Sequence, residues 1–371
     1  MALPVLTRWS TATVAHRARR LAGLVTSPLL PADYLDLIGP LRAGGDLRGR
    51  IVEVRFETRD AVTLVIKPGR GWRGHRPGQY VLIGVDVDGV RNWRAYSLTS
   101  PTAAPDGCIT VTVKAIPDGK VSNHLVRRVT PGTMIMLDQA AGDFTLLDQA
   151  PHKVLFLTAG SGITPVIGML RNAMGLDEVH ELEDVVVLHS APTAGDVIFG
   201  AELRTLAAKG AIRLIERHTD SDGKVTMDDV AALVPDWAHR ETWACGPTGL
   251  LDAAEKHWGA SGLAAHLHTE RFRPTALATG EGGTVTFARS EVTIESDGAT
   301  PLLDVGEEAG VLMPSGCRMG ICFGCVVPLR EGAVRDLRNG EITAAEPDKP
   351  DHAVLIQTCV SAAAGSCDID L

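Results

Sequence analysis

Four cysteines near the C-terminus have a spacing that binds iron. Cys317, Cys322 and Cys325 follow the pattern C-x4-C-x2-C, and Cys359 comes farther along the chain. Thiolates at this spacing hold a 2Fe-2S cluster, and the glycines beside them let the backbone wrap closely and turn N–H groups toward sulfur. Zinc is the alternative, but structural zinc ligands usually come as two short paired halves. The sequence therefore predicts a one-electron centre at these four cysteines.

The string Arg94-Ala95-Tyr96-Ser97 lies downstream of Pro-Gly-Gln-Tyr at residues 77–80. This pairing resembles the flavin-binding domain of the ferredoxin-NADP reductase superfamily. The resemblance implies that the arginine binds a flavin phosphate, the tyrosine stacks beside the flavin and the serine hydroxyl lies near the reactive ring nitrogen. Such strings also occur in strands that bind no ligand, so the flavin assignment depends on the neighbouring motifs.

A turn farther along the chain supports the same interpretation. Gly119, Lys120, Val121 and Ser122 follow a strand that ends near Lys114 and lead into a helix. In the superfamily this turn opens a helix whose N-terminal amides bind flavin phosphates. Ser122 as a helix N-cap is a compatible alternative. The resemblance thus implies FAD at this site, with Lys114 among the residues that bind it and with FMN as the alternative.

Two further motifs concern a pyridine nucleotide. A buried strand runs into Thr-Ala-Gly-Ser-Gly-Ile-Thr-Pro at residues 158–165, where small residues let a pyrophosphate approach the backbone. The string resembles the superfamily's nucleotide loop, which implies binding by Gly160, Ser161, Gly162 and Thr164. Cys245, Gly246 and Pro247 resemble its C-G-P motif, in which the cysteine lies against the nicotinamide. Ser97 and Cys245 are therefore the predicted catalytic pair, and an inert core thiol is the alternative for Cys245.

Ser190, at the end of the second predicted parallel strand, bears on coenzyme choice. No acidic residue follows it immediately, which favours NADPH over NADH. The loop after Ser190 lacks an arginine, so Arg204 or Arg217 would have to bind the 2′-phosphate. We expect NADPH and leave NADH open.

The elements that must position these residues fall into three domains after an extension over residues 1–47. Short strands over 48–149 predict an antiparallel flavin-binding β-barrel, and alternating strands and helices over 150–275 predict an α/β domain with a parallel sheet that binds NAD(P). Residues 283–371 resemble a plant-type ferredoxin domain, which implies an α+β β-grasp fold. The fold class is accordingly multidomain.

Composition and charge exclude several classes of protein. Hydrophobic residues make up 45% and charged residues 22% of the 371, which is typical of a soluble globular chain. No apolar run is long enough for a transmembrane segment, no signal peptide is indicated, and basic residues are too sparse for nucleic-acid binding. Residues 280–371 hold 6 Lys+Arg and 15 Asp+Glu, so the cluster domain carries the net charge of −9. The predicted location is the cytoplasm.

The order of the three modules suggests a reductase that delivers electrons to a separate partner. The chain resembles actinobacterial reductases that feed membrane acyl-CoA desaturases, which implies a desaturase partner and contact with the inner membrane face through basic residues 1–47; a packing arm is the alternative for that segment. Phthalate dioxygenase reductases, which use FMN and serve soluble ring-hydroxylating oxygenases, are the second hypothesis. An iron-sulfur redox sensor without turnover is the third.

Overall fold

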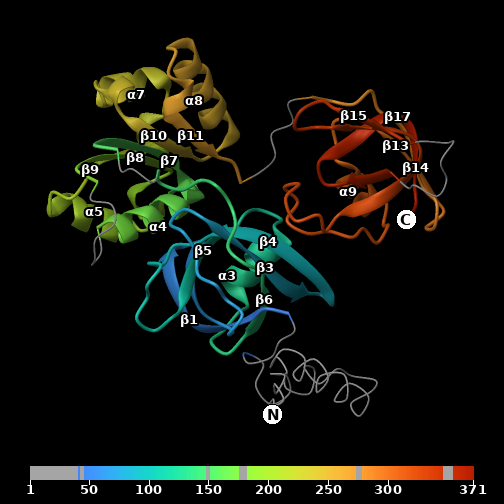
Figure 1. Cartoon of the computed structure of the whole chain (residues 1–371), viewed down its shortest axis with the longest axis horizontal. Coiled ribbons are helices and arrows are strands. Elements are labelled where there is room, and N and C mark those ends of the chain that lie inside the picture. Colours follow the sequence, from blue (N-terminus) through green and yellow to red (C-terminus); the bar gives the residue numbers. More distant parts are fainter. Residues whose placement is uncertain (1–40, 42–45, 148–150, 175–181, 273–277, 346–353) are drawn as a thin grey trace, which may run out of the picture.

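The computed structural model describes residues 41, 46–147, 151–174, 182–272, 278–345 and 354–371, which form three sheets with separate cores. Figure 1 shows the three bodies in chain order, from blue through green and gold to red. The predicted membrane contact through residues 1–47 falls almost wholly outside the described residues. No helix of the described ranges combines the length and apolarity needed to span a membrane.

The first body is an antiparallel barrel that ends in the predicted flavin strand. Its strands are β1 (Arg48–Thr58), β2 (Ala61–Pro68), β3 (Tyr80–Val87), β4 (Val90–Ser97), β5 (Ile109–Lys114) and β6 (Met134–Leu137), in the order β4-β3-β6-β1-β2-β5. A bridge between Leu98 and Val111 joins the two outer strands and closes the barrel. Helix α3 (Lys120–Arg127) buries Val121 and Leu125, one turn apart, against the barrel core.

The second body has a parallel sheet with helices on both faces, as predicted. Its order is β11-β10-β7-β8-β9, formed by β7 (Lys153–Ala159), β8 (Asp184–Ala191), β9 (Arg213–His218), β10 (Glu241–Cys245) and β11 (Leu267–Glu270). In Figure 1, α4 (Ile163–Ala173) and α5 (Gly200–Ala208) cover one face, while α7 (Met227–Leu233) and α8 (Thr248–Ala260) cover the other. The short α6 (Thr219–Asp222) follows β9. Parallel strands place all their carboxyl ends at one edge, where the predicted nucleotide motifs lie.

The third body has a mixed sheet with one short helix. Strands β12 (Gly283–Phe287), β13 (Val292–Ser296), β14 (Val326–Asp336), β15 (Ile342–Ala344) and β17 (Ser361–Ile369) pair in the order β13-β12-β17-β14-β15, and β16 (Val354–Gln357) pairs with β14. The β12–β17 pair is parallel and the others are antiparallel. Helix α9 (Leu302–Glu308) buries Leu302, Leu303 and Val305. The predicted fold class is confirmed for all three bodies.

The barrel and the parallel-sheet body are tightly joined where β4 ends. A Cβ added to Gly168 of α4 would lie 2.4 Å from the carbonyl oxygen of Leu98, so only glycine fits at this contact. Arg171, one turn later, donates to the carbonyl of Thr99 at 2.7 Å and forms a bidentate pair with Glu202. The helix that follows the nucleotide loop is thereby fixed to the end of the predicted flavin strand.

Candidate functional site

The predicted flavin motif occupies the end of β4. Tyr80 of β3 lies opposite Ser97, and Val81 lies opposite Tyr96. The Ser97 hydroxyl oxygen is buried and has no hydrogen-bond partner among the described residues, which is costly unless a bound group supplies one. Burial raises the pKa of the Tyr96 hydroxyl, so this ring stays neutral. These features fit a flavin ring beside the strand end.

The turn before α3 has the geometry of an anion site. Glycine is required at position 119 because a Cβ would lie 2.4 Å from the Ser122 hydroxyl oxygen. No side chain caps this helix N-terminus, and Ser122 instead bonds the backbone at Ile116 and Gly119. Its role as an N-cap is therefore not seen. Lys114 lies at the end of β5 and ion-pairs with Asp60 at 2.7 Å, so its amino group is already occupied.

In the nucleotide loop, one glycine leaves open space and another lets the backbone contact a neighbouring strand closely. Gly160 has φ of +55°, and no atom of the described residues lies within 4 Å of the Cβ that a larger residue would carry. A Cβ on Gly162 would lie 2.0 Å from the carbonyl oxygen of Cys245, so this glycine brings the loop against the end of β10. Ser161 and Thr164 are tied together by a hydrogen bond of 2.9 Å from the threonine hydroxyl to the serine carbonyl. The open space above Gly160 fits a pyrophosphate.

Cys245 lies beside a carboxyl group whose role the sequence did not reveal. It is fully buried at the end of β10, and Glu270 of β11 is its register partner. Burial raises the pKa of Glu270 to about 8, and its Oε2 atom is buried without a hydrogen-bond partner among the described residues. Burial, followed by the Glu270 charge, raises the pKa of the Cys245 thiol. A neutral acid and a neutral thiol therefore lie side by side at this edge, followed by Gly246 and by Pro247, the N-cap of α8.

Ser190 lies at the same edge, at the end of β8, opposite Arg217 of β9. Arg217 has loose ion pairs with Asp222 and Asp229, at 3.8 and 3.7 Å. Arg204 is held more closely, with its Nε atom 3.0 Å from Glu216. Of the two arginines that the sequence offered for a 2′-phosphate, Arg217 is therefore the better placed.

The four predicted cluster ligands form two thiol pairs. The sulfur of Cys325 lies 3.1 Å from that of Cys359. The side chains of Cys317 and Cys322 are also hydrogen-bonded to each other, and the sulfur of Cys322 accepts a bond from the backbone N–H of Cys317 at 3.0 Å. The backbone N–H groups of Met319 and Gly324 also point at sulfur. Over the described residues no three His, Cys, Asp or Glu side chains gather as a single-ion site. Two pairs fit a cluster that takes two thiolates on each iron.

The candidate residues of all three bodies meet near the end of β4. Arg94 donates to the carbonyl of Gly316, in the cysteine loop, at 3.1 Å. Burial raises the pKa of Tyr80, and the charges of Cys317 and Glu270 raise it further, which places Tyr80 within electrostatic reach of both. A cleft of about 480 Å³ opens between the barrel and the cluster domain, with Arg94, Lys120 and Arg318 in its lining. The sequence did not predict that the cluster domain would form a wall of this cleft.

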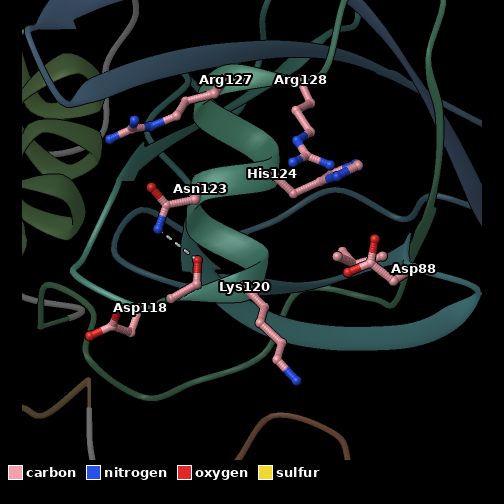
Figure 2. Close-up of a pocket in the computed structure, with 9 residues that line it drawn as sticks. Asp88, Asp118, Lys120, Asn123, His124, Arg127 and Arg128 are labelled. Carbon is pink, nitrogen blue, oxygen red and sulfur yellow. Dashed lines mark hydrogen bonds between the residues drawn. The ribbon is translucent and has the colours of Figure 1, made fainter.

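A second hollow, of about 330 Å³, continues from that cleft along α3. Figure 2 shows Lys120, His124, Arg127 and Arg128 along the helix, with Asp88 opposite. Both hollows share the residues at the start of α3. A basic, elongated groove of this type fits an extended anion.

Comparison with known families agrees with this geometry. Residues 58–146 match the family described as "Oxidoreductase FAD-binding domain", and residues 285–364 match the "2Fe-2S iron-sulfur cluster binding domain". In fold, the chain is similar to phthalate dioxygenase reductase, with a TM-score of 0.59 and 22% identity over 88% of this chain and 98% of that one.

Similarity to characterised sequences extends over nearly the whole chain. It is 52% identical to an "NADPH oxidoreductase" of Mycobacterium tuberculosis over 96% of this chain and 92% of the relative. It is 32% identical to the ferredoxin reductase component of a 3-ketosteroid-9-alpha-monooxygenase of Mycolicibacterium smegmatis, over 77% of this chain and 86% of the relative. The chain therefore belongs to the NAD(P)H oxidoreductases of the ferredoxin reductase type that join an FAD-binding domain to a C-terminal 2Fe-2S ferredoxin domain.

Proposed function

We propose that this oxidoreductase is the electron-delivery component of an oxygenase system and takes its electrons from NADPH. FAD accepts two electrons at once and releases them singly, the form in which a 2Fe-2S cluster takes them. The observation that carries the proposal is the meeting of three domains at the end of β4, where Arg94 bonds the cluster loop and Tyr80 lies near both Glu270 and Cys317. No pocket for a further substrate is needed, because the final oxidation takes place on a partner.

Ser97 and Cys245 are the proposed catalytic residues. The unpartnered Ser97 hydroxyl donates to the flavin ring, and the small Cys245 side chain holds the nicotinamide without blocking its approach. Glu270 joins them as a buried acid beside the nicotinamide, where it holds a proton at neutral pH. Gly160, Ser161, Gly162 and Thr164 hold the nucleotide pyrophosphate.

The proposed FAD site follows the two connected hollows. Arg94 and Lys120 bind the phosphate nearer the ring, at the uncapped start of α3. The adenosine half then extends along α3 into the hollow lined by His124, Arg127 and Arg128. FMN would leave this second hollow without a function, and FAD uses both.

NADPH is the proposed coenzyme because Ser190 and Arg217 lie side by side at the strand ends where a 2′-phosphate would bind. The relative that is 52% identical is named for NADPH. Steady-state reduction of an artificial acceptor tests this preference. A kcat/KM for NADH equal to or above that for NADPH would contradict it.

The proposed partner is a membrane fatty acyl-CoA desaturase, reached through the exposed edge of the cluster loop. Phe323 lies between two cluster ligands, is 68% exposed and has φ of +56°, a strained conformation for a bulky residue. An exposed aromatic side chain on an acidic domain suits a partner surface that has an apolar centre and a rim of basic residues. The desaturase itself is proposed from sequence resemblance alone.

A soluble oxygenase is the second candidate partner. Its support is the group of relatives named as reductase components of monooxygenases, at 28% to 32% identity. A redox sensor without turnover does not fit, because the chain belongs to a family of enzymes.

Reconstitution separates the two partners. The holoenzyme and NADPH are combined with a membrane desaturase or with a soluble monooxygenase, and product formation is compared at equal reduction of an artificial acceptor. Product from the desaturase alone supports the proposal. Product from the soluble oxygenase alone would contradict the desaturase proposal and support the soluble partner.

A further inference from the structure

We infer that Arg318, in the cysteine loop, is a flavin-binding residue, so that the phosphate of FAD is held from two domains at once. This inference rests on the proposed placement of FAD in the cleft beside Arg94. It adds to that placement a contact from the cluster domain, which neither the sequence motifs nor the domain descriptions assign.

The walls of the cleft supply the first argument. One wall belongs to the barrel and includes Asn92, Arg94, Gly119 and Lys120. The opposite wall belongs to the cluster domain and includes Glu307, the segment 310–313, Ser315 and Arg318. A group bound at Arg94 and at the start of α3 therefore faces the cluster domain across the cleft. Among the described cluster-domain residues of that lining, Arg318 is the only cation.

Charge supplies the second argument. Burial, followed by the charge of Arg318, lowers the pKa of Arg94, so the two guanidinium groups lie close enough to repel each other. Arg318 is paired with Asp304 and Glu307, whereas Arg94 has no carboxylate partner among the described residues, so an anion in this partly buried cleft would be favourable. A phosphate carries the charge that offsets Arg94 and accepts hydrogen bonds in the fork geometry of a guanidinium.

The orientation of Arg318 supplies the third argument. Its terminal nitrogens pair with Asp304 and Glu307 of α9, the first at 2.8 Å. These carboxylates fix the side chain, and its Nε atom is buried without a hydrogen-bond partner within the described part of the chain. The residue also has φ of +59°, a conformation that a non-glycine residue adopts at a cost. The Nε–H group of this fixed arginine would gain a hydrogen-bond partner from a ligand oxygen that reaches it.

The consequence is a coupling between flavin binding and domain contact. Arg94 already donates to the carbonyl of Gly316, next to the ligand Cys317. A phosphate between Arg94 and Arg318 adds a second link between the barrel and the same loop. Bound flavin then holds the cluster loop at the barrel.

The test measures flavin binding instead of turnover. Arg318→Gln is prepared as holoenzyme, FAD is removed under conditions that keep the visible absorbance of the cluster, and binding of FAD and of riboflavin is titrated by flavin fluorescence. Loss of a charge-assisted bond to phosphate predicts FAD binding weakened by about 10-fold to 100-fold. Riboflavin, which has no phosphate, should bind the variant and the wild type equally.

A matched variant makes the result specific. Arg330→Gln removes an arginine of the same domain that is 55% exposed and lies outside the cleft lining, and it should have no effect. Unchanged FAD binding in Arg318→Gln, an equal loss for riboflavin, or an equal loss in Arg330→Gln would each overturn the inference. Unchanged FAD binding in Arg94→Gln would instead overturn the proposed flavin placement on which it rests.

Discussion

Glu270 makes the stability of the nucleotide-binding domain depend on pH in a direction opposite to that of most carboxylates. Burial raises its pKa from 4.5 to about 8 in the folded protein. Between these values the unfolded chain releases a proton that the folded chain keeps. The free energy of unfolding therefore falls as the pH rises, by at most about 1.4 kcal/mol per pH unit and about 5 kcal/mol over the whole window. The substitution Glu270→Gln removes the ionisable group and with it this dependence.

Hydrogen exchange on the flavin-free protein measures this pH dependence of stability within the nucleotide-binding domain, which contains Glu270. The free energy of opening is followed in peptides that cover β10 and β11, which hold Cys245 and Glu270. Between about pH 5.5 and about pH 7.5 the wild type should lose up to about 3 kcal/mol relative to Glu270→Gln. If the free energy of opening changed equally with pH in both proteins, or fell only in the variant, the assignment of Glu270 as a buried neutral acid would be refuted.

Three further predictions address the nucleotide loop, coenzyme choice and partner docking. Gly162→Ala forces a methyl group to within 2.0 Å of the Cys245 carbonyl, so flavin reduction by NADPH should slow by about tenfold or more in stopped-flow measurements. Arg217→Gln should raise the KM for NADPH by about tenfold and leave the KM for NADH almost unchanged in steady-state assays. Phe323→Ala should raise the KM for the protein partner by about fivefold, measured by product formation, and leave reduction of a small artificial acceptor unaltered.

Each of these changes has a control in the same domain. Gly249→Ala on α8 places its methyl group in open space and should leave flavin reduction unchanged. Arg204→Gln removes the arginine that is already held by Glu216, so an equal effect on NADPH would contradict the role of Arg217. Ile342→Ala truncates another exposed apolar residue, 52% exposed on β15. If it weakened coupling as much as Phe323→Ala, the cluster-loop edge would not be the docking surface.

Local patterns in the sequence predicted the fold class and the character of the cluster site. Cysteine spacing depends on one loop and one later strand, and strand patterns reflect burial within each sheet, so both can be recognised along the chain. The approach of Arg94 to Gly316 joins residues 222 positions apart and depends on how two domains pack. The raised pKa of Glu270 likewise depends on the burial that tertiary packing creates. Lys114 remains a predicted flavin-binding residue, and its ion pair with Asp60 is a contact that the motif did not indicate.

The close contact of α4 with the carbonyl of Leu98 fixes the nucleotide-binding domain against the barrel. Transfer of an electron pair between two rings requires van der Waals contact, and a helix that meets the strand terminus at a glycine tolerates little slippage between the sites for those rings. The iron-binding loop meets the same barrel through the bond from Arg94 to the carbonyl of Gly316. Single-electron hopping tolerates a wider range of separations, so a small shift at this second contact would slow electron transfer less than the same shift at Gly168.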